Sequence, residues 1–216
     1  MIYTPLSQAK LEAAAFQAFQ TQGEPTDVQR QALLVLFLAI HSDCVAAGWW
    51  SDLTTGQRKK RNFGELMALI WSEVCEAEAA NGPDDKLPQY HGYPVEINDS
   101  LIRLCDVCGS GTFGDMKAIA GWAALTICQD DIMGQARNPI SQLAISWAAV
   151  FELGRKEKNF EKEIGTLFGQ LVLCAKDHFI DDGGVTAKIF AAKQAFNRQR
   201  ADHKVENRVA EGGKKV

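Results

Sequence analysis

Apolar residues recur along most of this chain at the spacing of a helix. The pattern is clearest from residue 65, where the apolar positions step by three and four and predict a helix with one face on a core: Leu66, Leu69, Ile70, Val74 and Ala77. Glu73 and Glu76 fall at the same spacing, so they lie beside or within this apolar stripe. After a loop rich in Pro and Gly, a second helix is predicted as far as Asp106, with these apolar residues: Leu101, Ile102, Leu104, Cys105 and Cys108.

The second helix also carries a line of charge, at Glu96, Asp99, Arg103 and Asp106. Residues three apart are neighbours on a helix surface, so each helix presents one pair of carboxylates. Antiparallel packing of the two helices would bring the pairs face to face. Unpaired carboxylates about 4 Å apart repel by roughly 4 kcal/mol at an effective dielectric constant of about 20, so a cation is expected among them. The alternative is a solvated acidic face.

An all-oxygen cluster of this kind favours Mg²⁺, with Mn²⁺ as the second choice, over zinc, which prefers nitrogen and sulfur ligands. A di-iron bundle requires Glu-x-x-His pairs, which neither helix has.

The rest of the chain reads as further helices in a single all-α domain spanning residues 1–216. They are expected at about 6–22, 27–47, 113–128, 141–153, 160–178 and 185–200. The helix at 27–47 is the most apolar and is expected to be central, with Thr26 as its N-cap. Turns are expected at 130–139 and 181–184. From Ala201 onward the chain is charged and is expected to be extended or disordered until a ligand binds.

Several short runs accompany the acidic pairs: Gly48-Trp49-Trp50, Arg61 to Leu66, Ser72-Glu73-Val74, Asp84 to Pro88, Ala195 to Arg198, Ala201 to Lys204, Glu206 to Arg208 and Glu211 to Lys215. In these runs and in its two acidic pairs, the chain resembles the MazG-like family of all-α nucleoside triphosphate pyrophosphohydrolases found in phages and bacteria. The resemblance covers residues 41–110 and 188–216. It implies a MazG-like helical bundle with a four-helix core, a catalytic hairpin region at 41–110 and a basic C-terminal helix and tail at 185–216.

Residues 113–180 are additional to the usual short family pattern. Ser141–Leu153 aligns with Glu65–Ala77, and Phe160–Asp177 aligns with Tyr93–Ser110. Two of the four acids keep an acidic counterpart in this alignment, at Glu152 and Glu163, and two are replaced, by Ala149 and Thr166. We interpret this as a degenerate internal repeat of the hairpin that packs on the active one as an internal half-dimer. The alternative is that any two amphipathic helices align this well.

The resemblance implies a Mg²⁺-dependent enzyme that cleaves an NTP or dNTP into the monophosphate and pyrophosphate with a metal-activated water. Glu73, Glu76, Glu96 and Asp99 would hold one to three Mg²⁺ ions. Glu73 and Glu76 would be catalytic, with Glu76 doubling as the general base. The predicted substrate-binding residues are Trp49, Trp50, Trp71, Lys86, Arg103, Lys193, Asn197, Arg198, His203 and Lys204.

Several of these residues also have an interpretation in which they do not contact the substrate. Lys86 reads equally as a solvated loop lysine, and Arg103 as a partner of Asp106 or Asp99. Trp49 and Trp50 are adjacent and cannot both face the core, so one could stack on the base, or both could cap the bundle. His41, on the apolar helix, is more typical of a satisfied core residue than of a ligand.

Composition narrows the class of protein further. The net charge of −4 does not favour a general nucleic-acid binder. The absence of a leader pattern and of a long apolar run predicts a cytoplasmic protein without a membrane partner. The six cysteines are predicted to be small core residues, the Cys105-x-x-Cys108 pair included. The family further implies a homo-oligomer, most simply a dimer. Two alternatives stay open: a non-catalytic nucleotide sensor or helical interaction module, and an alarmone (ppGpp-type) hydrolase on the same fold.

Overall fold

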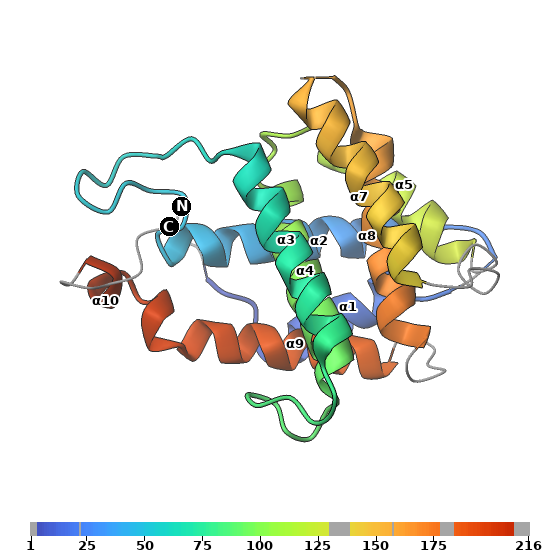
Figure 1. Ribbon diagram of the computed structural model, residues 1–216, viewed down its shortest axis with the longest axis horizontal. Coiled ribbons are helices and arrows are strands. Elements are labelled where there is room, and N and C mark those ends of the chain that lie inside the picture. The colour runs from blue at the N-terminus through green and yellow to red at the C-terminus, as the bar shows by residue number, and fades with distance from the viewer. Residues whose placement is uncertain (1–3, 22, 130–138, 157, 178–183, 210–216) are drawn as a thin grey trace.

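The computed structural model describes residues 4–21, 23–129, 139–156, 158–177 and 184–209, and these ranges are all-α (Figure 1). The prediction of an all-α fold is therefore confirmed. The helices are α1 (Gln8–Ala18), α2 (Asp27–Ala46), α3 (Phe63–Ala79), α4 (Gly92–Gly109), α5 (Met116–Cys128), α7 (Pro139–Arg155), α8 (Glu161–Asp177), α9 (Gly184–Gln199), the 3₁₀ turn η1 (Ala201–His203) and α10 (Val205–Val209). The turns expected at 130–139 and 181–184 lie almost wholly outside the described residues.

Polar caps fix where the helices of the main hairpin and its neighbour begin. Thr26 Oγ1 accepts a hydrogen bond from the Gln29 backbone N–H at 3.1 Å, as the sequence predicts for the start of α2. Asn62 caps α3 in the same way, accepting from the Glu65 N–H at 3.0 Å. In the loop between α3 and α4, Asp84 Oδ1 accepts from the backbone N–H groups of Lys86 and Leu87 at 2.9 and 2.7 Å. The hairpin that carries the acids is therefore closed by an ordered loop.

The helix at the centre of the fold is α4. It packs against α2, α3, α5, α8 and α9, and nearly all of its residues are buried. At its last residue, a Cβ on Gly109 would collide with the backbone carbonyl of Phe37, so α2 and α4 cross in close contact. The acidic residues of α4 consequently sit inside the molecule.

The sequence predicts that the helix at 27–47 is central, but only one face of α2 is buried. Its inner side chains, such as Leu36 and Phe37, are fully buried, whereas Val35 and Leu38 are 44% and 48% exposed. Among the described helices, α2 alone could cross a membrane by length and composition, a property that core helices of soluble proteins share. Its inner face packs into the core.

A second hairpin, α7–α8, lies against the first. α7 packs on α3 and on α8, and α8 packs on α4 and α5, so α3, α4, α7 and α8 form a four-helix group (Figure 1). The link between α3 and α7 is aromatic: the rings of Trp71 and Trp147 are 5.3 Å apart, and Trp147 Nε1 donates to the Met67 carbonyl at 3.1 Å. This arrangement agrees with the expected four-helix core. The origin of α7–α8 as a repeat stays a prediction.

The expectation of an extended or disordered segment after Ala201 is wrong for residues 201–209. These residues form η1 and α10, and Arg208 is 1% exposed. The guanidinium of Arg208 lies 3.6 Å from the centroid of the Trp49 ring, and its Nη1 donates to the Ala47 carbonyl at 2.7 Å. One long side chain thus docks the segment onto the end of α2, which a count of apolar residues cannot reveal. The Glu211–Lys215 run lies outside the described residues.

Candidate metal centre and ligand cavity

Three of the four predicted acids come together between α3 and α4. Carboxylate oxygens of Glu73, Glu76 and Glu96 all lie within 4.8 Å of one another, so the group could hold a metal ion. Glu73 and Glu96 are buried and Glu76 is exposed. The three ligands are hard oxygens, which fits Mg²⁺ or Mn²⁺. Glu96 Oε2 is buried and accepts no hydrogen bond, so a lone pair of this oxygen is available to a cation.

The fourth acid, Asp99, is engaged by helix α9. Its Oδ2 lies 3.2 Å from Lys193 Nζ, and its Oδ1 accepts a hydrogen bond from Asn197 Nδ2 at 3.1 Å. Lys193 Nζ also lies 3.7 Å from Glu96 Oε2. Lys193 and Asn197 were both predicted as substrate-binding residues, and in this structure both face the acids.

Two more cations flank the cluster. Arg103 Nη2 is 2.5 Å from Glu73 Oε1, so its partner is an acid of α3 rather than Asp106 or Asp99. Lys86 Nζ, in the hairpin loop, lies 3.9 Å from Glu96 Oε1 and 3.6 Å from Asp85 Oδ1. Both residues were predicted to contact substrate, and both lie beside the carboxylates.

The electrostatics of the cluster show that its negative charge is only partly compensated. Burial raises the pKa of Glu96 to about 7; Asp99 and Glu73 add to the rise, and Lys193 and Lys86 oppose it. Burial also raises the pKa of Glu73, against the influence of Arg103 and together with Asp99 and Glu76. A divalent cation would stabilise the ionised forms of both groups.

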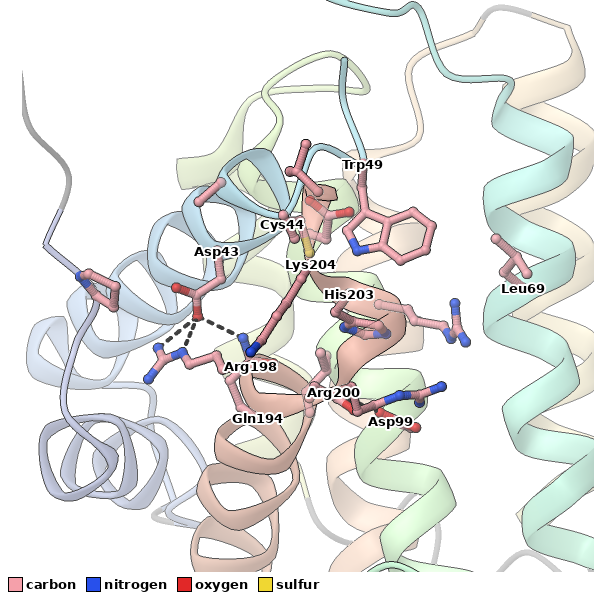
Figure 2. A pocket seen from close by; sticks show the side chains of 18 of the residues that line it. Asp43, Cys44, Trp49, Leu69, Asp99, Gln194, Arg198, Arg200, His203 and Lys204 are labelled. Carbon is pink, nitrogen blue, oxygen red and sulfur yellow. Dashed lines mark hydrogen bonds and ion pairs between the residues drawn. The ribbon is translucent and has the colours of Figure 1, made fainter. Parts of the chain in front are cut away.

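A cavity of about 500 Å³ includes Asp99 and Arg103 in its lining, and Figure 2 shows it from close by. Its walls come from the end of α2, from α3, α4 and α9, and from the segment after α9. This volume is in the range of small-molecule sites. Asp99 lies on the cavity wall, and six of the ten predicted substrate-binding residues line it: Trp49, Arg103, Asn197, Arg198, His203 and Lys204.

The structure places the remaining aromatic candidates away from this cavity. Trp50 is 3% exposed, and its Nε1 donates to Asp106 Oδ1 at 2.8 Å. His41 Nδ1 lies 2.8 Å from the same oxygen, so His41 is a satisfied interior residue. Trp71 packs on Trp147. These placements favour the packing alternative for Trp50 and a supporting role for Trp71.

Trp49 keeps a position on the cavity wall, with one ring face covered by Arg208 and His203 edge-on at 5.4 Å between ring centroids. An aromatic wall of this kind can support a flat ring in the cavity.

Several cavity residues escape prediction from the sequence. Asp43 accepts from Arg198 Nε at 2.8 Å and from Gln194 Nε2 at 2.7 Å, as Figure 2 shows, while Arg198 Nη1 donates to the Leu6 carbonyl at 2.7 Å. Arg198 therefore also ties the start of the chain to the cavity wall. Arg200 also lines the cavity; its pKa is raised mainly by hydrogen bonding to Asp202, with further contributions from Asp99 and Glu73.

A second, smaller hollow of about 320 Å³ meets the other side of the cluster. Glu76 and Glu96 line it together with Asn81, Asp84 and Asp85 of the hairpin loop. The acidic cluster is therefore flanked by an acid-lined hollow and by a larger cavity that carries several cationic side chains.

Comparisons with protein-family models, with curated proteins and with solved structures found no match to this chain. The structure itself defines the class: an all-α protein with an acidic cluster able to hold a metal ion, next to a cavity of ligand size.

Proposed function

We propose that this protein is a Mg²⁺-dependent nucleotide pyrophosphohydrolase of the MazG-like type, which cleaves an NTP or dNTP into the monophosphate and pyrophosphate. The observation that carries the proposal is the position of the Glu73, Glu76 and Glu96 oxygens, within 4.8 Å of one another. Arg103, the ion-pair partner of Glu73, lines a cavity that carries further cationic side chains. Hydrolysis of a phosphoanhydride needs this combination of hard-cation ligands and phosphate-binding charge.

Glu73, Glu76 and Glu96 would hold Mg²⁺, which, when bound, supplies a more acidic water and neutralises charge on the phosphate oxygens. Arg103, Arg200 and Lys204 line the cavity and would bind the phosphates. Trp49 would support the base. These assignments place the triphosphate in the larger cavity, because the acid-lined hollow would repel it.

Glu76 is the exposed member of the acidic group and lines the smaller hollow, and it is not among the residues that line the larger cavity. Water can therefore reach the cluster from the hollow while the nucleotide occupies the cavity. Glu76 would accept the proton of that water as general base, a role that is typically worth about 10²–10⁴-fold in rate.

The test is pyrophosphate release from the eight standard NTPs and dNTPs, with and without Mg²⁺, by the wild type, Glu76→Gln and Glu78→Gln. Glu78 is exposed on the same helix and contributes nothing to the acidic group. We expect Mg²⁺-dependent release that falls about a hundredfold or more in Glu76→Gln and is unchanged in Glu78→Gln.

Each other result has a distinct meaning. Release from a guanosine tetraphosphate alarmone alone would replace the substrate and keep the metal chemistry. Absence of both release and Mg²⁺ binding would overturn the proposal and leave the nucleotide-sensor reading.

A further inference from the structure

Lys193 is the most deeply buried cation at the acidic cluster. Its side chain is 0% exposed, in the middle of α9, although α9 begins and ends near the surface. A buried ammonium is costly unless acidic partners surround it. Its Nζ lies 3.2 Å from Asp99 Oδ2 and 3.7 Å from Glu96 Oε2. Lys193 thus places its ammonium group next to two of the four predicted metal ligands.

Asp99 has both oxygens occupied by α9, one by Lys193 and the other by Asn197. Asp99 is also absent from the group of acids whose oxygens lie within 4.8 Å of one another. Glu96 differs, because its Oε2 is buried and accepts no hydrogen bond. Glu73 and Glu96 also have cationic partners, so what separates Asp99 from the other three acids is that its oxygens lie outside their 4.8 Å group.

The charges point the same way. In the described part of the chain, three cationic side chains lie within 4 Å of the four carboxylates, namely Lys193, Arg103 and Lys86. Over these groups one formal negative charge remains, and Asp85, 3.6 Å from Lys86 Nζ, adds a second; a single divalent ion neutralises both. A second ion at Asp99 would have to lie next to the ammonium of Lys193, and the two charges would repel each other.

We infer that the Lys193 ammonium takes the place of a second metal ion, so that the resting protein binds one divalent cation, at Glu73, Glu76 and Glu96. This rests on the proposed function, because it concerns the same metal centre. It follows that any further metal ion used in the reaction enters already bound to the phosphates of the nucleotide. Asp99 is then a positioning residue that holds Lys193 and Asn197.

The experiment counts bound ions without measuring activity. Mn²⁺ is titrated into the full-length, chelator-treated protein and free Mn²⁺ is followed by electron paramagnetic resonance, with Mg²⁺ calorimetry in parallel. The wild type should bind one ion. Lys193→Met should bind two, or bind the first about tenfold more tightly, because the competing charge is gone. Lys188→Met, an exposed position on the same helix, should behave like the wild type.

Two substitutions in α4 give an independent reading if Lys193→Met does not fold, which circular dichroism will show. Asp99→Asn should still bind one ion, within about threefold of the wild-type affinity, because Asp99 acts outside the ligand set. Glu96→Gln should lose about tenfold or more, as expected when a metal ligand is removed.

Two ions in the wild type, one of them lost in Asp99→Asn, would overturn the inference and leave the proposed enzyme intact. Wild-type affinity and a single ion in a folded Lys193→Met would overturn it as well. No bound ion in the wild type would overturn both this inference and the proposed function. One bound ion without pyrophosphate release would support the inference while contradicting the enzyme.

Discussion

Gly165 and Gly169 on α8 mark the closest contact between α8 and α5. A Cβ at Gly165 would lie 2.6 Å from the Ile119 carbonyl oxygen and 2.7 Å from Trp122 Cβ. At Gly169 the added atom would lie 2.5 Å from Thr126 Cβ. A carbonyl oxygen and two Cβ atoms cannot rotate away as the end of a flexible side chain can. Gly165→Ala therefore forces the two helices apart.

The size of the effect follows from two opposing contributions. Alanine stabilises a helix by about 0.5–1 kcal/mol relative to glycine. Overpacking a close contact costs about 1–3 kcal/mol and occasionally more, because backbone must move. A contact with a carbonyl oxygen at 2.6 Å belongs at the upper end of that cost. With the gain of alanine subtracted from a cost of about 3 kcal/mol, we expect Gly165→Ala to lower the free energy of unfolding by about 2–2.5 kcal/mol. Each kcal/mol corresponds to about 2–4 °C in Tm.

Urea unfolding followed by circular dichroism measures this difference, and α5 offers a matched control. Gly121 is also helical, but a Cβ there would meet nothing within 4 Å. Gly121→Ala should therefore stabilise the protein by about 0.5–1 kcal/mol. Equal stabilisation of Gly121→Ala and Gly165→Ala would refute the close α5–α8 contact, since the same substitution would then meet open space at both positions.

Two further predictions concern the metal centre and the C-terminal segment. Because the pKa of Glu96 is about 7 and a metal needs its ionised form, Mg²⁺ affinity measured by calorimetry should fall about tenfold from pH 8 to pH 6, a dependence that Glu96→Gln should lose. The same raised pKa means that the metal-free protein loses stability from this group as the pH rises from about 4.5 through about 7. Arg208→Met removes the hydrogen bond to the Ala47 carbonyl and the contact with Trp49, so the Tm should fall by a few degrees and limited proteolysis should cut residues 201–209 faster. Mg²⁺ affinity in Arg208→Met should not change; a large loss would show that α10 shapes the acidic group.

Local patterns predict the hairpin acids well, because Glu73 and Glu76 lie on the apolar stripe of their own helix. They do not predict that Lys193 is buried. The sequence of α9 places it with the polar side, together with Arg198, yet Lys193 is fully buried. Its direction is set by Asp99 and Glu96 on another helix, about a hundred residues away in the chain, and no local period contains that information.

The adjacent tryptophans show the same limit. The sequence establishes that Trp49 and Trp50 face different surroundings. The structure assigns Trp50 to the interior because Asp106, on α4, accepts its indole N–H at 2.8 Å. Trp49 is left on the cavity wall, where Arg208 covers one face. Which ring faces inward thus depends on an acceptor that only the tertiary fold supplies.

The second hairpin supports the first without repeating its chemistry. Glu152, aligned with Glu76, binds Arg155 at 2.9 Å and Lys156 at 2.7 Å, and its side chain is 46% exposed. In the described residues, the one acidic group of ligand geometry belongs to α3 and α4. What α7 contributes is Trp147, packed on Trp71. Because the described part of this hairpin has no such acidic group, the proposed function gives one metal centre per chain. A dimer, as the family resemblance implies, would then carry two such centres, and a monomer one. Light scattering combined with the Mn²⁺ count distinguishes these assemblies.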